Sequence, residues 1–156
     1  MNKKLPEWFG KKRIVNTCFD NTSTEIIKWE VLPVNNGQHI KVRFLKADSE
    51  NRQGIVAAIY AGDGTLSVNG VTGRFFELWA DECPPEFEIV CNSAEGFLSV
   101  YNIFEENSWS GKRKVSQMDF SGMILEKNGN KYKYCCNNAK LNQDFDKLIF
   151  EIELLC

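Results

Sequence analysis

Hydrophobic and polar side chains alternate along most of the chain, with turn residues about every 8 to 12 positions. In His39–Leu45, for example, Ile40, Val42 and Phe44 point to one side, which predicts a strand with one face in water. The pattern predicts about ten strands in all, from eleven candidate ranges: Ile14–Phe19, Glu25–Leu32, His39–Leu45, Gly54–Tyr60, Thr65–Val68, Arg74–Trp79, Glu86–Cys91, Gly96–Phe104, Gly122–Lys127, Lys131–Cys136 and Leu148–Leu155.

Three features of this pattern suggest how the strands assemble. Gly54–Tyr60 is apolar almost throughout, so we expect a central strand buried on both faces. Glycine pairs such as Asp63-Gly64 and Asn69-Gly70 supply the positive φ of tight hairpins. The polar segment Glu105–Asp119 is expected to be the longest loop. No amphipathic helix is evident, so residues 1–156 are predicted to form one all-β domain, a two-sheet antiparallel β-sandwich of jelly-roll or Greek-key type.

Composition narrows the class of protein. Hydrophobic residues make up 43% and charged residues 26% of the 156 residues, which is typical of a globular chain and not of a disordered one. The net charge of −2 argues against a nucleic-acid partner. The first residues contain two lysines but no apolar run, and no stretch is long enough to span a membrane. We therefore expect a cytoplasmic protein, and a surface or extracellular one only after processing or signal-independent export.

Six cysteines and a single histidine limit the chemistry of the chain. No C-x-x-C pair occurs, and His39 is the only histidine, so a Cys/His zinc site is not expected. The cysteines are read as reduced thiols that serve partly as core residues, or as disulfides if the protein is cut from a longer precursor. His39 has no motif that would pair it with a nucleophile, and no phosphate-binding loop occurs. The sequence predicts no catalytic residues and no enzyme.

The acidic turn near the C-terminus is the candidate metal site. Asn142, Asp144 and Asp146 are oxygen-bearing side chains at alternate positions, and a tight turn brings such positions together in a way that suits Ca²⁺. The segment resembles the C-terminal calcium loop of small calcium-dependent bacterial lectins, with Phe145 at the aromatic position. This resemblance implies calcium-dependent sugar binding. Asn142 replaces the first acid and Lys147 the last, so the loop would be degenerate. An acidic turn that caps the last strand without metal is the alternative.

Two tryptophans stand close to basic clusters and are the candidate ligand-binding residues. Trp109 precedes Lys112 and Arg113, and Trp8 precedes a similar cluster at residues 11–13. Such a Trp can stack on a sugar ring or anchor a protein interface; solvated turns with partly buried tryptophans are the alternative.

Two functions are compatible with these features. The leading hypothesis is a non-catalytic binding module, lectin-like or adhesion-type, with Ca²⁺ as its cofactor and carbohydrate as its ligand. The alternative is a cytosolic protein-interaction domain, such as an inhibitor, an immunity protein or an assembly subunit, whose partner is another protein. A homo-oligomer is compatible with both.

Overall fold

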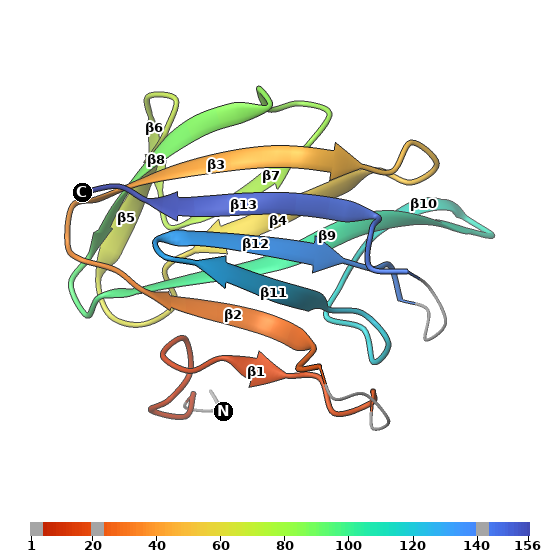
Figure 1. The fold of residues 1–156 in the computed structure, drawn as a ribbon, viewed down its shortest axis with the longest axis horizontal. Coiled ribbons are helices and arrows are strands. Elements are labelled where there is room, and N and C mark those ends of the chain that lie inside the picture. The colour runs from red at the N-terminus through yellow and green to blue at the C-terminus, as the bar shows by residue number, and fades with distance from the viewer. Residues whose placement is uncertain (1–4, 20–23, 140–143) are drawn as a thin grey trace.

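A computed structural model of the chain describes residues 5–19, 24–139 and 144–156, and these residues form thirteen strands and no helix (Figure 1). The prediction of an all-β fold is therefore confirmed, whereas the expected number of strands was too low. The strands are β1 Ile14–Val15, β2 Ile27–Pro33, β3 Gln38–Ala47, β4 Gln53–Ala58, β5 Gly64–Val68, β6 Val71–Gly73, β7 Phe75–Trp79, β8 Glu86–Ser93, β9 Phe97–Ser108, β10 Gly111–Ser116, β11 Met123–Asn128, β12 Lys131–Cys136 and β13 Leu148–Leu154.

The strands form one continuous antiparallel sheet that curls on itself. Its order is β6-β5-β8-β3-β13-β12-β11-β2-β9-β4-β7, with β1 beside β2 and β10 beside β9. In Figure 1, β4 and β9 lie behind the layer made by β3, β13, β12 and β11. The expected pair of separate sheets is not distinct, because β2 belongs to both layers: Ile27 pairs with β11, and the range 30–33 pairs with β9. The result is a nearly closed, barrel-like sheet.

A single residue joins the two ends of this strand order. β6 and β7 are its outermost strands, yet only Arg74 separates them in the chain. The Arg74 guanidinium donates hydrogen bonds to the carbonyl oxygens of Ile59 at 3.0 Å, Gly62 at 2.8 Å and Gly64 at 3.3 Å. Arginine can make these bonds at once because it carries five donors in a planar fork. The two ends of the curled sheet are thereby tied together.

The core lies inside the curl and agrees with the apolar pattern of the sequence. All six residues of β4 are buried between β7 and β9, which confirms the predicted central strand. Tyr134, Phe104 and Phe150 are the largest fully buried side chains. The rings of Tyr134 and Phe150 stack with their centroids 5.0 Å apart.

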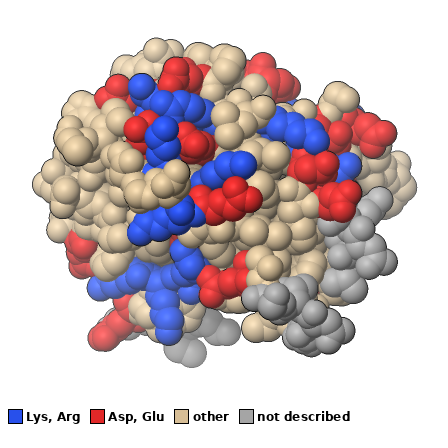
Figure 2. All heavy atoms as spheres, in the orientation of Figure 1, with Lys and Arg blue, Asp and Glu red and all other residues tan. Residues whose placement is uncertain are grey.

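The outer face of the front layer carries charges of alternating sign. The strand register aligns a row of side chains across β8, β3, β13, β12 and β11, namely Glu86, Arg43, Glu151, Lys133 and Glu126. Figure 2 shows blue and red side chains mixed across this face. Arg43 lies 2.7 Å from Glu151 in this row. Its hydrogen bond to Glu153 lowers the pKa of the Glu153 carboxyl. The face is therefore a solvated one, as the alternation in His39–Leu45 predicted.

One ion pair is buried inside the fold and involves the N-terminal segment. Glu30, on β2, has no exposed surface. Its carboxylate accepts hydrogen bonds from Arg13 Nε at 2.8 Å, Arg13 Nη2 at 2.9 Å and Tyr134 Oη at 2.7 Å. The hydrogen bond to Glu30 raises the pKa of Arg13, and burial raises the pKa of Tyr134. This network fastens the N-terminal segment to the sheet.

The turn predictions had mixed outcomes. Asn69 and Gly70 both have positive φ, 49° and 82°, and form a tight turn as expected, but this turn leads into the short strand β6, which was not predicted. The prediction of a tight hairpin at Asp63-Gly64 was wrong, because β5 pairs with β6 and β8 and not with β4. There the positive φ belongs to Gly62, at 70°.

Candidate functional site

The segment expected to be the longest loop, Glu105–Asp119, instead contains most of a projecting β-hairpin. β9 continues to Ser108 and β10 starts at Gly111, so the two strands pair in register along six positions. Ser108 closes the turn, since its hydroxyl donates to the Gly111 carbonyl at 2.6 Å. In Figure 1 the hairpin extends beyond the rest of the sheet. The loop prediction failed because residues 105–116 are polar, and a polar hairpin lacks the apolar alternation by which strands are recognised.

Trp109 occupies the tip of this hairpin and is fully exposed, at 100%. The hairpin also brings two other predicted ligand-binding residues close to it. Arg113 lies opposite Glu106 and donates to its carboxylate at 2.8 Å, and Lys112 lies opposite Asn107. The β9–β10 hairpin therefore carries three of the four predicted ligand-binding residues, Trp109, Lys112 and Arg113.

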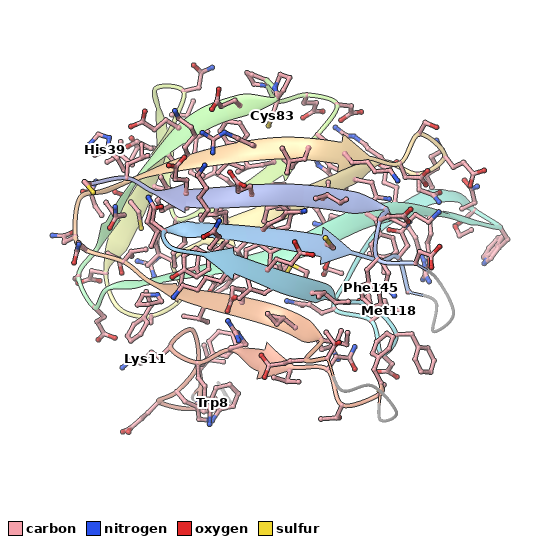
Figure 3. All side chains as sticks on the ribbon, in the orientation of Figure 1. Trp8, Lys11, His39, Cys83, Met118 and Phe145 are labelled. Atoms are coloured by element: carbon pink, nitrogen blue, oxygen red, sulfur yellow. The ribbon has the colours of Figure 1, made fainter. Side chains whose placement is uncertain are left out.

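Trp8, the fourth predicted ligand-binding residue, lies elsewhere. Figure 3 places it near the N-terminal segment, away from the end of the molecule that carries the hairpin. Its side chain is 48% exposed, while the neighbouring Phe9 packs edge-on against Trp29 with centroids 5.4 Å apart. Two of the three basic residues after Trp8 are engaged within the chain: Lys11 pairs with Glu95 at 3.0 Å, and Arg13 reaches Glu30. The structure does not bring the two tryptophan clusters together.

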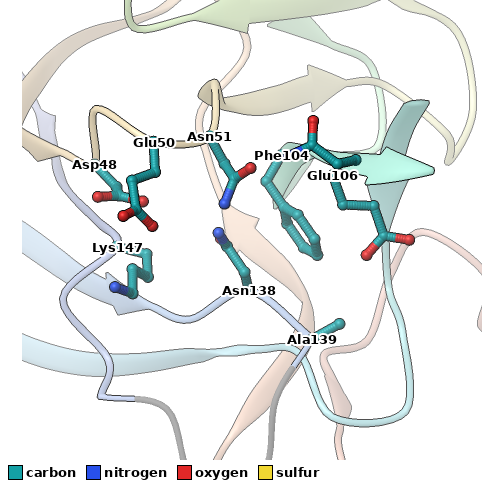
Figure 4. Close-up of a pocket in the computed structure, with 9 residues that line it drawn as sticks. Asp48, Glu50, Asn51, Phe104, Glu106, Asn138, Ala139 and Lys147 are labelled. Atoms are coloured by element: carbon teal, nitrogen blue, oxygen red, sulfur yellow. The ribbon is translucent and has the colours of Figure 1, made fainter. Parts of the chain in front are cut away.

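A polar cleft of about 300 Å³ lies at the base of the hairpin (Figure 4). Its walls are the β3–β4 loop, the end of β9, the residues that follow β12 and the residue that precedes β13. In Figure 4 the side chains of Glu50, Asn51 and Asn138 point into the same space. Three of the described lining residues carry a carboxylate and one carries an ammonium group; these residues are Asp48, Glu50, Asn51, Phe104, Glu106, Asn107, Asn138, Ala139 and Lys147.

A second cleft, of about 410 Å³, lies on the other side of the same loop. It shares Asp48, Glu50 and Asn51 with the first, and Lys112 of the hairpin also lines it. Arg52 closes one wall: it donates to Asp81 at 2.9 Å and stacks 4.3 Å from the centre of the Trp79 ring. Both clefts thus meet at the β3–β4 loop.

Two buried acceptors at this loop have no hydrogen-bond partner among the described residues. Gln53, which lines the second cleft, is only 2% exposed, and its Nε2 donates to the Asn51 carbonyl at 3.3 Å. Its Oε1 is unpaired, and so is the buried Oδ2 of Asp48. Buried polar atoms without partners are uncommon in folded proteins, and a donor from a ligand or from water would satisfy these two acceptors.

The acidic turn predicted to hold calcium lies only partly within the described residues. Asn142 lies outside them, Asp144 is exposed, and Asp146 Oδ2 lies 3.1 Å from Lys46 Nζ. Phe145 packs against Phe19 with centroids 5.8 Å apart, so the aromatic residue does anchor the turn. Within the described ranges, no three His, Cys, Asp or Glu side chains form a group that would hold a metal ion.

The cysteines and the histidine do not assemble into a reactive site in the described residues. His39 is an exposed residue on β3, and its Nδ1 lies 2.6 Å from Glu88. All six cysteines are free thiols. Burial raises the pKa of Cys91 to about 11 and that of Cys136 well above its ordinary value, so both thiols stay protonated in the core.

Sequence reasoning missed the residues that line the clefts. The signal was present in Asp48-Ser49-Glu50-Asn51, a short acidic and amide-rich run between two strands, but nothing in the sequence shows that it faces residues 104–107, Asn138, Ala139 and Lys147. No helix in the described part of the chain is long and apolar enough to cross a membrane. Comparisons with protein-family models, curated proteins and solved structures give no match.

Proposed function

We propose that this protein is a non-catalytic binding module that contacts another protein through the β9–β10 hairpin. The observation that carries the proposal is the complete exposure of Trp109 at the hairpin tip. In this reading the module acts as a cytosolic interaction domain, such as an inhibitor, an immunity protein or an assembly subunit, on a scaffold of the jelly-roll or Greek-key class.

The chemistry of the hairpin supports a protein partner. Tryptophan is a large apolar residue, and at full exposure it contributes nothing to the protein's own core. It is also one of the residue types most often found as an energetic anchor in protein interfaces, together with arginine. Trp109 has Arg113 on the same hairpin, and a turn tied by Ser108 holds it away from the sheet. An anchor on a paired hairpin loses little conformational freedom on binding.

Substituting Trp109→Ala tests this proposal. We expect it to weaken binding by about 2 kcal/mol, or roughly thirtyfold in Kd, because the ring would lose its pocket on the partner. The melting temperature should not change, since the side chain touches no core residue. The partner is first captured with the wild-type chain and identified, and its affinity is then measured by calorimetry. Trp8→Ala is the matched control and should bind normally; equal affinities of wild type and Trp109→Ala would refute the proposal.

A lectin-like module with a degenerate calcium loop at Asn142–Asp146 is the second candidate. It is supported by the exposure of Asp144 and by the packing of Phe145 on Phe19, which would hold such a turn in place. The amide at Asn142 and the cation at Lys147 would make the site weak, in the range of about 10⁻⁴ to 10⁻³ M.

Calcium titration tests this candidate. At about 10 mM Ca²⁺ the melting temperature should rise, because binding to the folded state alone stabilises it by mass action. Asp146→Asn should abolish the rise, and EGTA should reverse it. If calorimetry finds no heat and the melting temperature is the same with calcium and with chelator, the calcium loop is wrong.

A further inference from the structure

We infer that the two clefts at the base of the hairpin receive basic side chains, arginine or lysine, from the protein partner. This inference rests on the proposed function, since it assigns a partner chemistry to the same end of the molecule. It names a binding element that Trp109 alone does not provide. In this arrangement the hairpin tip anchors the partner, and the clefts select a segment that carries positive charge.

Charge is the first argument for a basic ligand. Asp48, Glu50 and Glu106 line the smaller cleft, and among the described residues of its lining Lys147 is the one cation. Glu106 is already engaged by Arg113. In the part of the chain that the structure describes, no ion pair within 4.0 Å involves Asp48 or Glu50. These two carboxylates line both clefts; Glu50 is exposed and Asp48 is partly buried.

The unpaired acceptors are the second and independent argument. Gln53 Oε1 and Asp48 Oδ2 are buried and accept no hydrogen bond from the residues that the structure describes. A ligand that satisfies both must be a donor, and an anion or a carbonyl would leave them unpaired. Guanidinium groups carry five N–H donors and ammonium groups three, and neither has an acceptor. Hydrogen bonds from a cation to a carboxylate are also the stronger kind.

The size of the clefts supports a side chain as the occupant. At about 300 and 410 Å³ they lie at the low end of small-molecule sites, and both are open to solvent on one side. Each accommodates one long side chain. Because the clefts share the β3–β4 loop, one short basic segment can occupy both.

A titration with synthetic peptides tests the inference on the full chain. The probe is acetyl-Gly-Arg-Gly-Arg-Gly-amide, and its counterpart has citrulline, which has nearly the same shape but no charge, in place of arginine. We expect the arginine peptide to bind with a Kd near about 1 mM and to shift the backbone NMR signals of residues 48–53 and 104–107. The citrulline peptide should cause no such shifts. Asp48→Asn and Glu50→Gln should each weaken the arginine peptide about tenfold.

Glu126→Gln is the control, because it removes a carboxylate from the solvated face of the sheet and lies in neither cleft. It should bind the arginine peptide as the wild type does. The inference is overturned if both peptides bind equally, if Glu50→Gln binds as tightly as wild type, or if the signal shifts map to the solvated face. Capture of the partner through Trp109 is measured separately, so loss of peptide binding with intact capture refutes the clefts alone. If Trp109→Ala binds the partner as tightly as the wild type does, the proposed function is refuted instead.

Discussion

Replacing Arg13 with alanine is expected to lower the free energy of unfolding by about 3–5 kcal/mol. The substitution leaves the Glu30 carboxylate, which has no exposed surface, without its bidentate partner. Among the described residues, Tyr134 and the backbone amide of Val31 would still donate to it. An uncompensated charge in an apolar interior is among the most destabilising changes that a single substitution can make. The N-terminal segment would also lose its attachment to β2.

Urea denaturation followed by tryptophan fluorescence measures this effect. Lys11→Ala is the matched control, because Lys11 also forms an ion pair, with Glu95, but both side chains are more than 40% exposed. A surface pair of this kind contributes about 0–1 kcal/mol, so its loss should be nearly neutral. If Arg13→Ala and Lys11→Ala destabilise the protein equally, the Glu30 ion pair does not fasten the segment in the way described.

A triple variant separates the buried charge from lost packing. Arg13→Met, Glu30→Leu and Tyr134→Phe together remove both charges and the hydroxyl that depends on them. Replacing a whole buried polar network with apolar groups of similar size is often neutral, whereas removal of one partner is not. The triple variant should therefore be more stable than Arg13→Ala. A further loss of stability would mean that shape, and not charge, dominates at this site.

The Arg13 network shows where inference from the sequence stops. Arg13 belongs to a basic run after Trp8, and that run suggested a solvent-exposed ligand site. Glu30 stands in a strand whose pattern gives no reason to expect a buried carboxylate. The two residues meet because β1 pairs with β2 in a register that brings their side chains together, and one register among many cannot be chosen from local patterns. Long-range pairing decided the role of this arginine.

Features set by neighbouring residues were predicted correctly. The apolar run that became β4 and the Asn69-Gly70 turn depend on local burial and on local φ, both of which the sequence encodes directly. The two clefts are formed by segments far apart in the chain. Of their described lining residues, Lys112 alone was predicted from the sequence to bind a ligand. The curl of the sheet was missed for the same reason, since the shared strand β2 has no local signature.

Gly64→Ala is expected to destabilise the fold by about 3 kcal/mol through a close approach of two strands. Gly64 starts β5 and lies opposite Ser93 of β8. A methyl group at this position would overlap the carbonyl oxygen of Asn92 and lie 3.1 Å from the Ser93 Cα. Backbone atoms cannot move aside as a flexible side chain can, so β5 must shift. The Gly64 carbonyl also accepts a hydrogen bond from Arg74, and a shift of β5 would therefore loosen the closure of the sheet.

Thermal unfolding of Gly64→Ala beside Gly73→Ala tests this account, because both glycines lie in strands and neither has a positive φ. A methyl group at Gly73 would lie 3.6 Å from the Phe76 ring, which is an ordinary contact. Gly73→Ala should consequently be neutral or slightly stabilising, since alanine restricts the unfolded chain more than glycine does. Amide hydrogen exchange should become faster in β5 and β6 of Gly64→Ala and stay unchanged in β12 and β13. Equal stabilities of the two variants would show that β5 and β8 tolerate a side chain between them, and that the curl closes without this close approach.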